Sequence, residues 1–173
     1  MKGVIVSCLR ELVVNKFGKD KWHATLAAAG CHKEISFLPT EDVDDASVLE
    51  LVEAVRKILN MSFEQLADTF GEYWACTYAP RIYRTYYQRA ASAKEFLLDM
   101  DEVHRLSTER MPNAHPPRFE YSWTSNKTLI INYKSKRKLI DFMTGLIKGV
   151  GKHYKEKLQV SKLDDEHIQI VFS

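Results

Sequence analysis

The sequence lacks the usual marks of secreted, membrane-spanning and zinc-binding proteins. Its three cysteines (Cys8, Cys31 and Cys76) lie far apart and form no C-x-x-C pair, which argues against a zinc knuckle, a thioredoxin motif or a disulfide framework. No stretch approaches the roughly 20 apolar residues of a membrane span. Polar side chains between Ser7 and Glu11 break the apolar start that a signal peptide would need. These absences predict a soluble cytoplasmic protein.

The chain also has little net charge, but its charges are unevenly placed. The balance of 25 Lys and Arg against 23 Asp and Glu gives only +2, which does not by itself imply a nucleic-acid partner. Residues 34–53 hold seven acidic side chains and no basic one, whereas residues 127–157 hold nine basic and two acidic ones. Two solvated faces of opposite sign explain this pattern, and a partner-docking surface is the alternative.

The first part of the chain has the apolar spacing of helices. Residues 4–13 carry an apolar stripe, and a shorter helix over residues 19–29 should end at Gly30, since glycine readily takes the left-handed conformation that follows a helix. An acidic loop follows, in which Asp45 or Ser47 could cap a helix that runs to about residue 60.

Three further helical segments are expected before the prolines of the central region. Ser62 and Gln65 match a capping box, in which each side chain accepts a hydrogen bond from the other residue's backbone N–H. Pro80 should open a short helix. Residues 93–111 have the pattern of one long helix that ends before Pro112.

The second part of the chain alternates as β-strands do. We expect four antiparallel strands, with one apolar helix over residues 136–154 between the two hairpins. With 173 residues the chain can form a single domain with a sizeable core. The expected fold class is α+β, an N-terminal helical subdomain packed on a four-stranded antiparallel sheet with helices. The expected strands cover residues 118–125, 126–135, 156–163 and 167–173, with turns at 125–126 and 164–165.

His104 is the first candidate functional residue. A histidine on an apolar helix face is most often a hydrogen-bonded core residue. One imidazole is too few for a zinc site, which needs three or four protein ligands. It suffices for haem, however, because the porphyrin supplies the four equatorial nitrogens. On the expected helix, His104 shares an apolar face with Phe96, Leu97, Met100 and Val103.

A row of hydrogen-bond donors follows the second expected strand. Because successive side chains of a strand point to opposite faces, Tyr133, Ser135 and Arg137 should share one face. They offer a phenol, a hydroxyl and a guanidinium, which suits a ligand with two carboxylates such as the propionates of haem. The same row could instead cap the sheet edge, or bind another dianion without haem.

Four motifs together resemble those of the H-NOX family, the haem–nitric oxide/oxygen binding domains of bacteria and of the N-terminus of soluble guanylate cyclase. They are the start MKGVIV, the MDEVH that ends at His104, the Pro-Pro pair that follows, and the Tyr-x-Ser-x-Arg row that ends at Arg137. The resemblance spans essentially the whole chain. It implies non-covalent haem b with His104 as the proximal iron ligand, and it implies that Tyr133, Ser135 and Arg137 hold the propionates.

The resemblance places further residues around the haem. Pro117 falls on the family proline that presses on the porphyrin, Ile5 on the distal isoleucine, and Asp45 on the acidic residue that bonds the arginine. The haem would lie within a single domain, between a distal helical lobe of about residues 1–60 and the helices and sheet of about residues 61–173. The other expected pocket residues are Leu9, Trp74, Tyr78, Met100, Phe142 and Leu146.

The resemblance also predicts which gas is bound. Oxygen-binding members carry a distal tyrosine at the position of Phe142, and its hydroxyl donates a hydrogen bond to dioxygen. Phenylalanine has no such donor, and a lost hydrogen bond to a partly charged ligand costs on the order of 1.5–3 kcal/mol. We therefore expect a sensor that binds nitric oxide and CO and excludes oxygen. The alternative is an oxygen binder with Tyr78 or Trp74 as the donor.

The sequence contains no constellation that would make this chain an enzyme, since a nucleophile with its base, a carboxylate pair and a Walker loop are all missing. The resemblance implies signalling by release of His104 from the iron. The output would pass to a bacterial histidine kinase or a diguanylate cyclase/phosphodiesterase, with no nucleic acid or membrane as partner. The remaining alternative is a non-haem module that uses the basic residues 127–157 to bind anions or nucleic acid.

Overall fold

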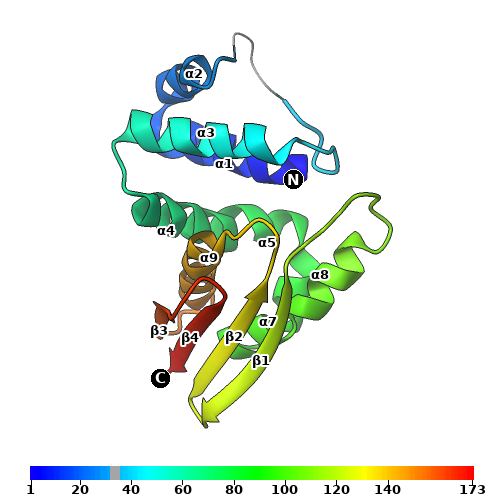
Figure 1. The fold of residues 1–173 in the computed structure, drawn as a ribbon. Helices are drawn as coiled ribbons and strands as arrows, with labels where there is room; N and C mark the ends of the chain where they lie inside the picture. The colour runs from blue at the N-terminus through cyan, green and yellow to red at the C-terminus, as the bar shows by residue number, and fades with distance from the viewer. Residues whose placement is uncertain (32–35) are drawn as a thin grey trace. The chain divides into compact units, whose positions relative to one another are not determined.

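The computed structural model describes residues 1–31 and 36–173 and divides into two compact units (Figure 1). Helices and one four-stranded antiparallel sheet make up the described chain, so the expected α+β class is confirmed. The first unit comprises Met1–Leu66 with Met111–His115, and the second comprises Ala67–Arg110 with Pro116–Ser173.

Helices α1 (Gly3–Phe17), α2 (Lys19–Ala28) and α3 (Asp45–Leu59) belong to the first unit. The apolar stripe of α1 is buried as predicted, and Leu9 and Leu12 are fully covered. The end of α2 also follows the prediction, because Gly30 has a φ of 71°. This conformation lets the Cys31 N–H reach the Leu26 carbonyl at 2.8 Å, which closes the last turn of the helix.

The start of the chain is fixed against the acidic loop of the first unit. Lys2 forms a β-bridge with Asp42, and its ammonium lies 2.6 Å from the Asp42 carboxylate. Gly3 is so close to the loop that an added Cβ would lie 2.3 Å from the Leu38 carbonyl oxygen. The third position of MKGVIV therefore admits only glycine. Glu34, the first acidic residue of the loop segment, lies outside the described residues.

Two helix starts in the first unit depend on side-chain caps. Asp44 caps α3 by accepting the Ser47 N–H at 3.0 Å, so the prediction of Asp45 or Ser47 as the cap was wrong. The acceptor must precede the free N–H by about three residues, which Asp44 does. The capping box is confirmed, since Ser62 Oγ accepts the Gln65 N–H at 3.1 Å and Gln65 Oε1 accepts the Ser62 N–H at 2.8 Å.

A run of helical segments leads into the second unit: α4 (Phe63–Tyr73), the π-helical turn η1 (Trp74–Tyr78), α5 (Ala79–Ile82), α6 (Arg84–Arg89), α7 (Ala93–Leu98) and α8 (Met100–Thr108). Pro80 lies in the first turn of α5, as predicted. The single long helix predicted over residues 93–111 was wrong, because the chain forms α7 and α8 instead. They separate at Asp99, and aspartate favours helix ends over helix interiors.

The sheet of the second unit has the strand order β1-β2-β4-β3, with all neighbours antiparallel (Figure 1). The first hairpin turns at residues 126–127, one residue later than predicted. Every second residue of β2 and β4 is buried, and the helix between the two hairpins contributes to the same core. The elements are β1 (Arg118–Ser125), β2 (Thr128–Lys134), α9 (Ile140–His153), β3 (Leu158–Lys162) and β4 (His167–Phe172).

The predicted row of donors does not lie along one strand. Tyr133 is buried on β2, but the strand ends at Lys134. Ser135 then forms a turn in which its Oγ accepts the Arg137 N–H and its carbonyl accepts the Lys138 N–H, both at 3.3 Å. Serine hydroxyls stabilise such turns in competition with strand pairing. The prediction of a shared strand face was therefore wrong, and the three donors follow a strand end and a turn.

Helix α9 crosses α4 at very short range. It begins at Ile140, later than predicted, because the turn after β2 precedes it. A Cβ added to Gly145 would lie 2.2 Å from the Ala67 carbonyl oxygen, and one added to Gly149 would lie 2.2 Å from the Gly71 carbonyl oxygen. Only glycine allows the two helix backbones to approach this closely.

Candidate functional site

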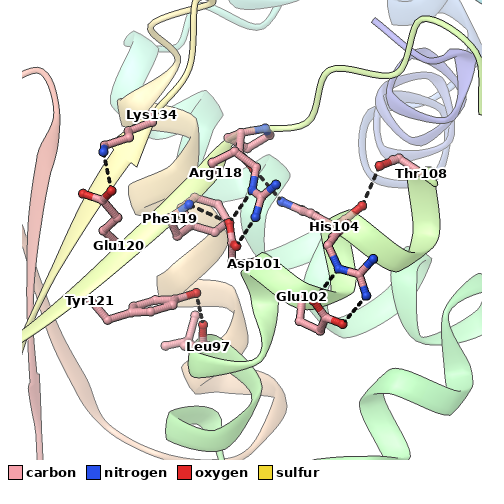
Figure 2. A network of polar contacts seen from close by, with 12 residues as sticks. Leu97, Asp101, Glu102, His104, Thr108, Arg118, Phe119, Glu120, Tyr121 and Lys134 are labelled. Carbon is pink, nitrogen blue, oxygen red and sulfur yellow. Dashed lines mark hydrogen bonds and ion pairs between the residues drawn. The ribbon is translucent and has the colours of Figure 1, made fainter.

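His104 lies on α8, and a backbone carbonyl holds its ring (Figure 2). Nδ1 is 3.2 Å from the Pro117 carbonyl oxygen. Because a carbonyl can only accept, Nδ1 carries the hydrogen and Nε2 keeps its lone pair. Burial lowers the pKa of His104, which favours the neutral ring. The side chain therefore offers Nε2 as a neutral nitrogen ligand.

Asp101, one turn before His104, fastens α8 to the start of β1 (Figure 2). Its carboxylate accepts two hydrogen bonds from the Arg118 guanidinium, at 2.8 and 2.5 Å, and one from the Phe119 N–H at 2.8 Å. The Arg118 bonds, followed by that of Phe119, hold the pKa of Asp101 below its ordinary value. Helix α8 is thus bonded at two points to residues 117–119.

Aromatic rings connect His104 to the end of β2. The ring centroids of His104 and Phe119 are 5.3 Å apart, and those of Phe119 and Tyr133 are 6.2 Å apart. Ser135 and Arg137 are half-buried in the turn that follows. Since Phe119 on β1 pairs with Tyr133 on β2, the structure brings the histidine and the predicted anion-binding residues to the same end of the sheet.

A second group of rings extends over α4, η1 and α9. Trp74 stacks on Phe70 at a centroid distance of 6.0 Å and on Tyr78 at 5.7 Å. Phe142 meets Phe70 edge-on at 5.6 Å, and the Arg81 guanidinium lies 5.3 Å from the centre of the Tyr78 ring. Three predicted pocket residues, Trp74, Tyr78 and Phe142, thus belong to one aromatic row. It includes the π-helical turn, a feature frequent at functional sites.

The other predicted pocket residues belong to both units. Met100 and Leu146 are half-buried in the second unit. Ile5 and Leu9 lie on α1 of the first unit, half-buried and buried respectively. Asp45 also belongs to the first unit, where its carboxylate holds the N-terminal amino group. Its predicted bond to the arginine of the donor row stays a prediction.

The donor set of the second unit fits haem better than a bare metal ion. Within the described ranges, no group of three or more His, Cys, Asp and Glu could hold a metal. His104 offers one nitrogen, so the other ligands must come from a cofactor such as a porphyrin. Tyr133, Ser135 and Arg137 offer donors for anionic groups, and the aromatic row offers an apolar wall. The residues present therefore fit a haem with two propionates.

Sequence reasoning missed the contribution of Asp101, Arg118 and Phe119. A signal for the ion pair was present, because MDEVH places an acidic residue one helical turn before its histidine. The Pro-Pro pair is followed directly by an arginine. Opposite charges beside two motifs of one site could have suggested that the two segments meet.

The comparisons with known sequences agree with these features. The chain matches the Haem-NO-binding family model (HNOB) over residues 2–162. The soluble guanylate cyclases gcy-32 and gcy-34 of Caenorhabditis elegans are each 26% identical to it over 157 residues, which cover 88% of this chain and 23% of theirs. The chain therefore spans about a quarter of the length of these curated relatives.

Solved H-NOX structures share the fold over the whole chain. A Cs H-NOX mutant that carries 4-cyano-L-phenylalanine has a TM-score of 0.86 at 25% identity, covering 100% of this chain and 97% of that one. An oxygen-binding H-NOX domain related to soluble guanylate cyclases, in its oxygen complex, has a TM-score of 0.83 at 25% identity, covering 100% and 95%. The family match and these structures lead to one conclusion: the chain belongs to the Haem-NO-binding (H-NOX) family, whose domains bind haem and sense gases.

Proposed function

We propose that this domain binds haem b through His104, takes up nitric oxide and CO while excluding oxygen, and signals to a partner protein. One observation carries the proposal: Nδ1 of His104 is committed to the Pro117 carbonyl, which leaves a neutral Nε2 for a metal. Haem would supply ferrous iron with an open position for a gas ligand. Tyr133, Ser135 and Arg137 would hold the propionates through charge-assisted hydrogen bonds.

The selectivity for nitric oxide and CO rests on Phe142. Its ring packs edge-on against Phe70 and carries no hydrogen-bond donor. A polar ligand such as oxygen would gain no bond from this position, a loss on the order of 1.5–3 kcal/mol. That corresponds to about tenfold to over a hundredfold in affinity. Nitric oxide, which is less polar when bound, loses little.

Oxygen binding is the second candidate function. An H-NOX domain that binds oxygen is 25% identical to this chain, so oxygen binding occurs among proteins at this level of sequence identity to it. Tyr78 is buried in the aromatic row, and Trp74 or Tyr78 could donate to a bound gas. The Tyr78 ring stacks on Trp74 and lies beneath the Arg81 guanidinium, so it packs as part of the aromatic row. This packing favours the first candidate function, a sensor that excludes oxygen.

Signalling would depend on the attachment of α8 to the cofactor. His104 would be the residue that the iron releases when nitric oxide binds, and α8 would then lose its tether to the cofactor. Such an element has two states that a ligand can bias. The domain would itself be a sensor without catalytic activity. Its proposed partner, in a bacterial cytoplasm, is a histidine kinase or a diguanylate cyclase/phosphodiesterase.

Nucleic acid is not the proposed partner, although residues 127–157 are basic. Within the basic segment 127–157, Lys148 bonds Asp68 at 2.8 Å and Lys152 pairs with Glu72, so part of the positive charge is compensated within the chain. The part of the chain that the structure describes contains no helix with the length and apolarity to cross a membrane.

Replacement of His104 by Gly tests the proposed function. The variant should lose stable haem, and added imidazole should restore a five-coordinate ferrous absorption spectrum. His115, an exposed histidine of the first unit, provides the matched control as His115→Gly. A normal spectrum of His104→Gly without imidazole would show that another residue binds the iron. A wild-type protein that takes up no haem would overturn the proposal altogether.

A further inference from the structure

We propose that Asp101 is the positioning residue for His104: it fixes the Pro117 carbonyl that orients the imidazole, and so sets the strength of the bond between His104 and the iron. The inference rests on the proposed function, because it assumes haem bound by His104. It assigns a separate role to a carboxylate that touches neither the cofactor nor the gas. Its basis is the network of polar contacts between α8 and β1 (Figure 2).

Two neighbouring side chains of α8 reach the same short segment. Asp101 and His104 are three residues apart and therefore share a helix face. His104 Nδ1 bonds the Pro117 carbonyl at 3.2 Å, and the Asp101 carboxylate accepts the Phe119 N–H at 2.8 Å. The carbonyl and the N–H flank one residue, Arg118. Fixing the N–H therefore restricts the rotation of the backbone that carries the carbonyl.

Arg118 makes this restriction stronger. Its guanidinium binds both oxygens of Asp101, at 2.8 and 2.5 Å, in the parallel geometry that gives arginine–carboxylate pairs their directional strength. The carboxylate is thereby held from two sides, by the side chain of Arg118 and by the backbone of Phe119. Asp101 keeps only 24% of its side chain exposed, so water competes weakly for these bonds.

The orientation of an imidazole affects its strength as a ligand. A histidine that donates its second N–H to a fixed acceptor is held in one tautomer and becomes more basic, and loss of such a supporting contact typically costs about 10–100-fold in metal affinity or activity. Without Asp101, the Pro117 carbonyl would be free to turn away from Nδ1. The His104–iron bond should then weaken, and nitric oxide should displace His104 more readily.

Glu102 provides a matched control. It is the next carboxylate on α8, but its partner is Arg105 on the same helix, at 2.6 Å, and not the start of β1. Asp101→Ala and Glu102→Ala therefore remove one negative charge each from adjacent positions. Asp101→Asn keeps an oxygen that can accept the Phe119 N–H but loses the charge that binds Arg118. Arg118→Gln leaves the Asp101–Phe119 bond in place.

The test compares haem-loaded proteins by resonance Raman spectroscopy of the unliganded ferrous state. Asp101→Ala should shift the iron–histidine stretching band to lower frequency and transfer haem to apomyoglobin about tenfold faster than wild type. Asp101→Asn and Arg118→Gln should shift the band in the same direction by less, and Glu102→Ala should leave it in place. A role in folding alone would lower the yield of haem-loaded protein without moving the band.

The outcomes separate this inference from the function on which it rests. If wild type binds haem and His104→Gly abolishes the band, but Asp101→Ala retains the wild-type frequency, the inference is wrong and the proposed function stands. Equal shifts in Asp101→Ala and Glu102→Ala would also overturn it, because charge alone would explain them. Should Asp101→Ala fail to fold, wild-type bands in both Asp101→Asn and Arg118→Gln would overturn it.

Discussion

The second unit contributes two candidate walls to the haem site, one at α8 and one at α9. Different interactions hold these two helices in place. At α8, hydrogen bonds from His104 and to Asp101 fasten the helix to residues 117–119. At α9, contact through Gly145 and Gly149 brings the helix against α4, and aromatic rings pack beside the crossing. Directional bonds hold one wall, and close packing holds the other.

This difference bears on what each wall can do. Hydrogen bonds can be exchanged for bonds to water at a net cost on the order of 0.5–1.5 kcal/mol for a neutral pair such as His104 and Pro117, and about 1.5–3 kcal/mol where a carboxylate takes part. A close-packed helix crossing cannot shift without steric overlap. We infer that the α8 wall suits a part that must change state, and that the α9 wall suits a pocket of fixed shape. Substitutions at α9 should therefore act on stability first, and those beside α8 and the donor turn on haem binding.

The largest expected effect is at the glycine crossing. In Gly145→Ala, the three heavy atoms nearest the new methyl group all belong to the backbone, and they include the Ala67 carbonyl oxygen at 2.2 Å and the Asp68 nitrogen at 3.0 Å. Backbone atoms cannot rotate away, so the free energy of unfolding should fall by about 3 kcal/mol, the upper end for overpacked sites. Urea denaturation measures this change.

Gly151→Ala is the control on the same helix. Its methyl group would first meet Cγ and Cδ1 of Leu158, at 2.9 and 3.0 Å, with the Glu156 carbonyl oxygen at 3.1 Å, and the leucine can change rotamer. It should cost clearly less than Gly145→Ala. If both variants lose the same free energy of unfolding, the close contact between α9 and α4 does not determine stability. The two walls would then not differ as inferred.

The next largest effect is expected at the donor turn. Arg137→Ala should speed the loss of haem to apomyoglobin about tenfold to a hundredfold, because a propionate loses a charge-assisted bond on the order of 1.5–3 kcal/mol. Lys136→Ala, an exposed cation in the same turn, removes the same charge and should change the rate little. Similar rates in both variants would mean that net charge, and not the arginine bond, retains the haem.

The elements with strong local signals could be predicted from the sequence. Gly30 ends α2 and Ser62 with Gln65 opens α4 because a few adjacent residues decide each of these structures. The apolar alternation of β2 and β4 likewise marked the buried face of the sheet. His104 could be singled out because Met100 and Val103 precede it on α8 with the spacing of an apolar helix face, whereas Phe96 and Leu97 of the expected face lie on α7.

What the sequence did not predict depends on competition or on distant partners. Ser135 could extend a strand or bond the Arg137 N–H in a turn, and the alternation rule ignores the second possibility. The bond from Phe119 to Asp101 joins segments that meet only through the fold. The close approach at Gly145 is equally hidden, because a glycine in a helix carries no mark of what it packs against.

A smaller effect, and a sharper test of the packed wall, is expected for gas selectivity. Phe142→Tyr adds a hydroxyl to a ring that Phe70 holds edge-on. If the pocket keeps its shape, the new donor should raise oxygen affinity at least about tenfold, the value of one added hydrogen bond to a polar ligand. Tyr78→Phe should change oxygen affinity little. Spectral titration with oxygen measures both, and a stable wild-type oxygen complex that Tyr78→Phe abolishes would make the domain an oxygen binder.

The smallest expected effect concerns the pH dependence of stability, which differs between Asp101 at α8 and His153 at the end of α9. At α8, the bonds from Arg118 keep the pKa of Asp101 below its ordinary value, so this carboxylate stays charged near neutrality and adds no pH dependence there. At the end of α9, His153 lies 4.8 Å from the rings of both Tyr87 and Tyr154, and burial lowers its pKa from the ordinary value of 6.5.

The sign of this effect follows from which state binds the proton first. Well above pH 6.5, His153 is neutral in the folded and the unfolded chain and contributes nothing. As the pH falls through 6.5, the unfolded chain takes up the proton before the folded one does, so the free energy of unfolding should decrease until the folded pKa is passed.

Urea denaturation of haem-loaded protein between pH 7 and 5 should show a small loss of unfolding free energy in wild type, and His153→Gln should reduce this loss. The exposed histidine of α2 serves as the control in His23→Gln, which should leave the wild-type slope unchanged. If His153→Gln keeps the full slope, the packing at the end of α9 does not disfavour the charged ring, and the packed wall is less closed to water at that end than its ring contacts indicate.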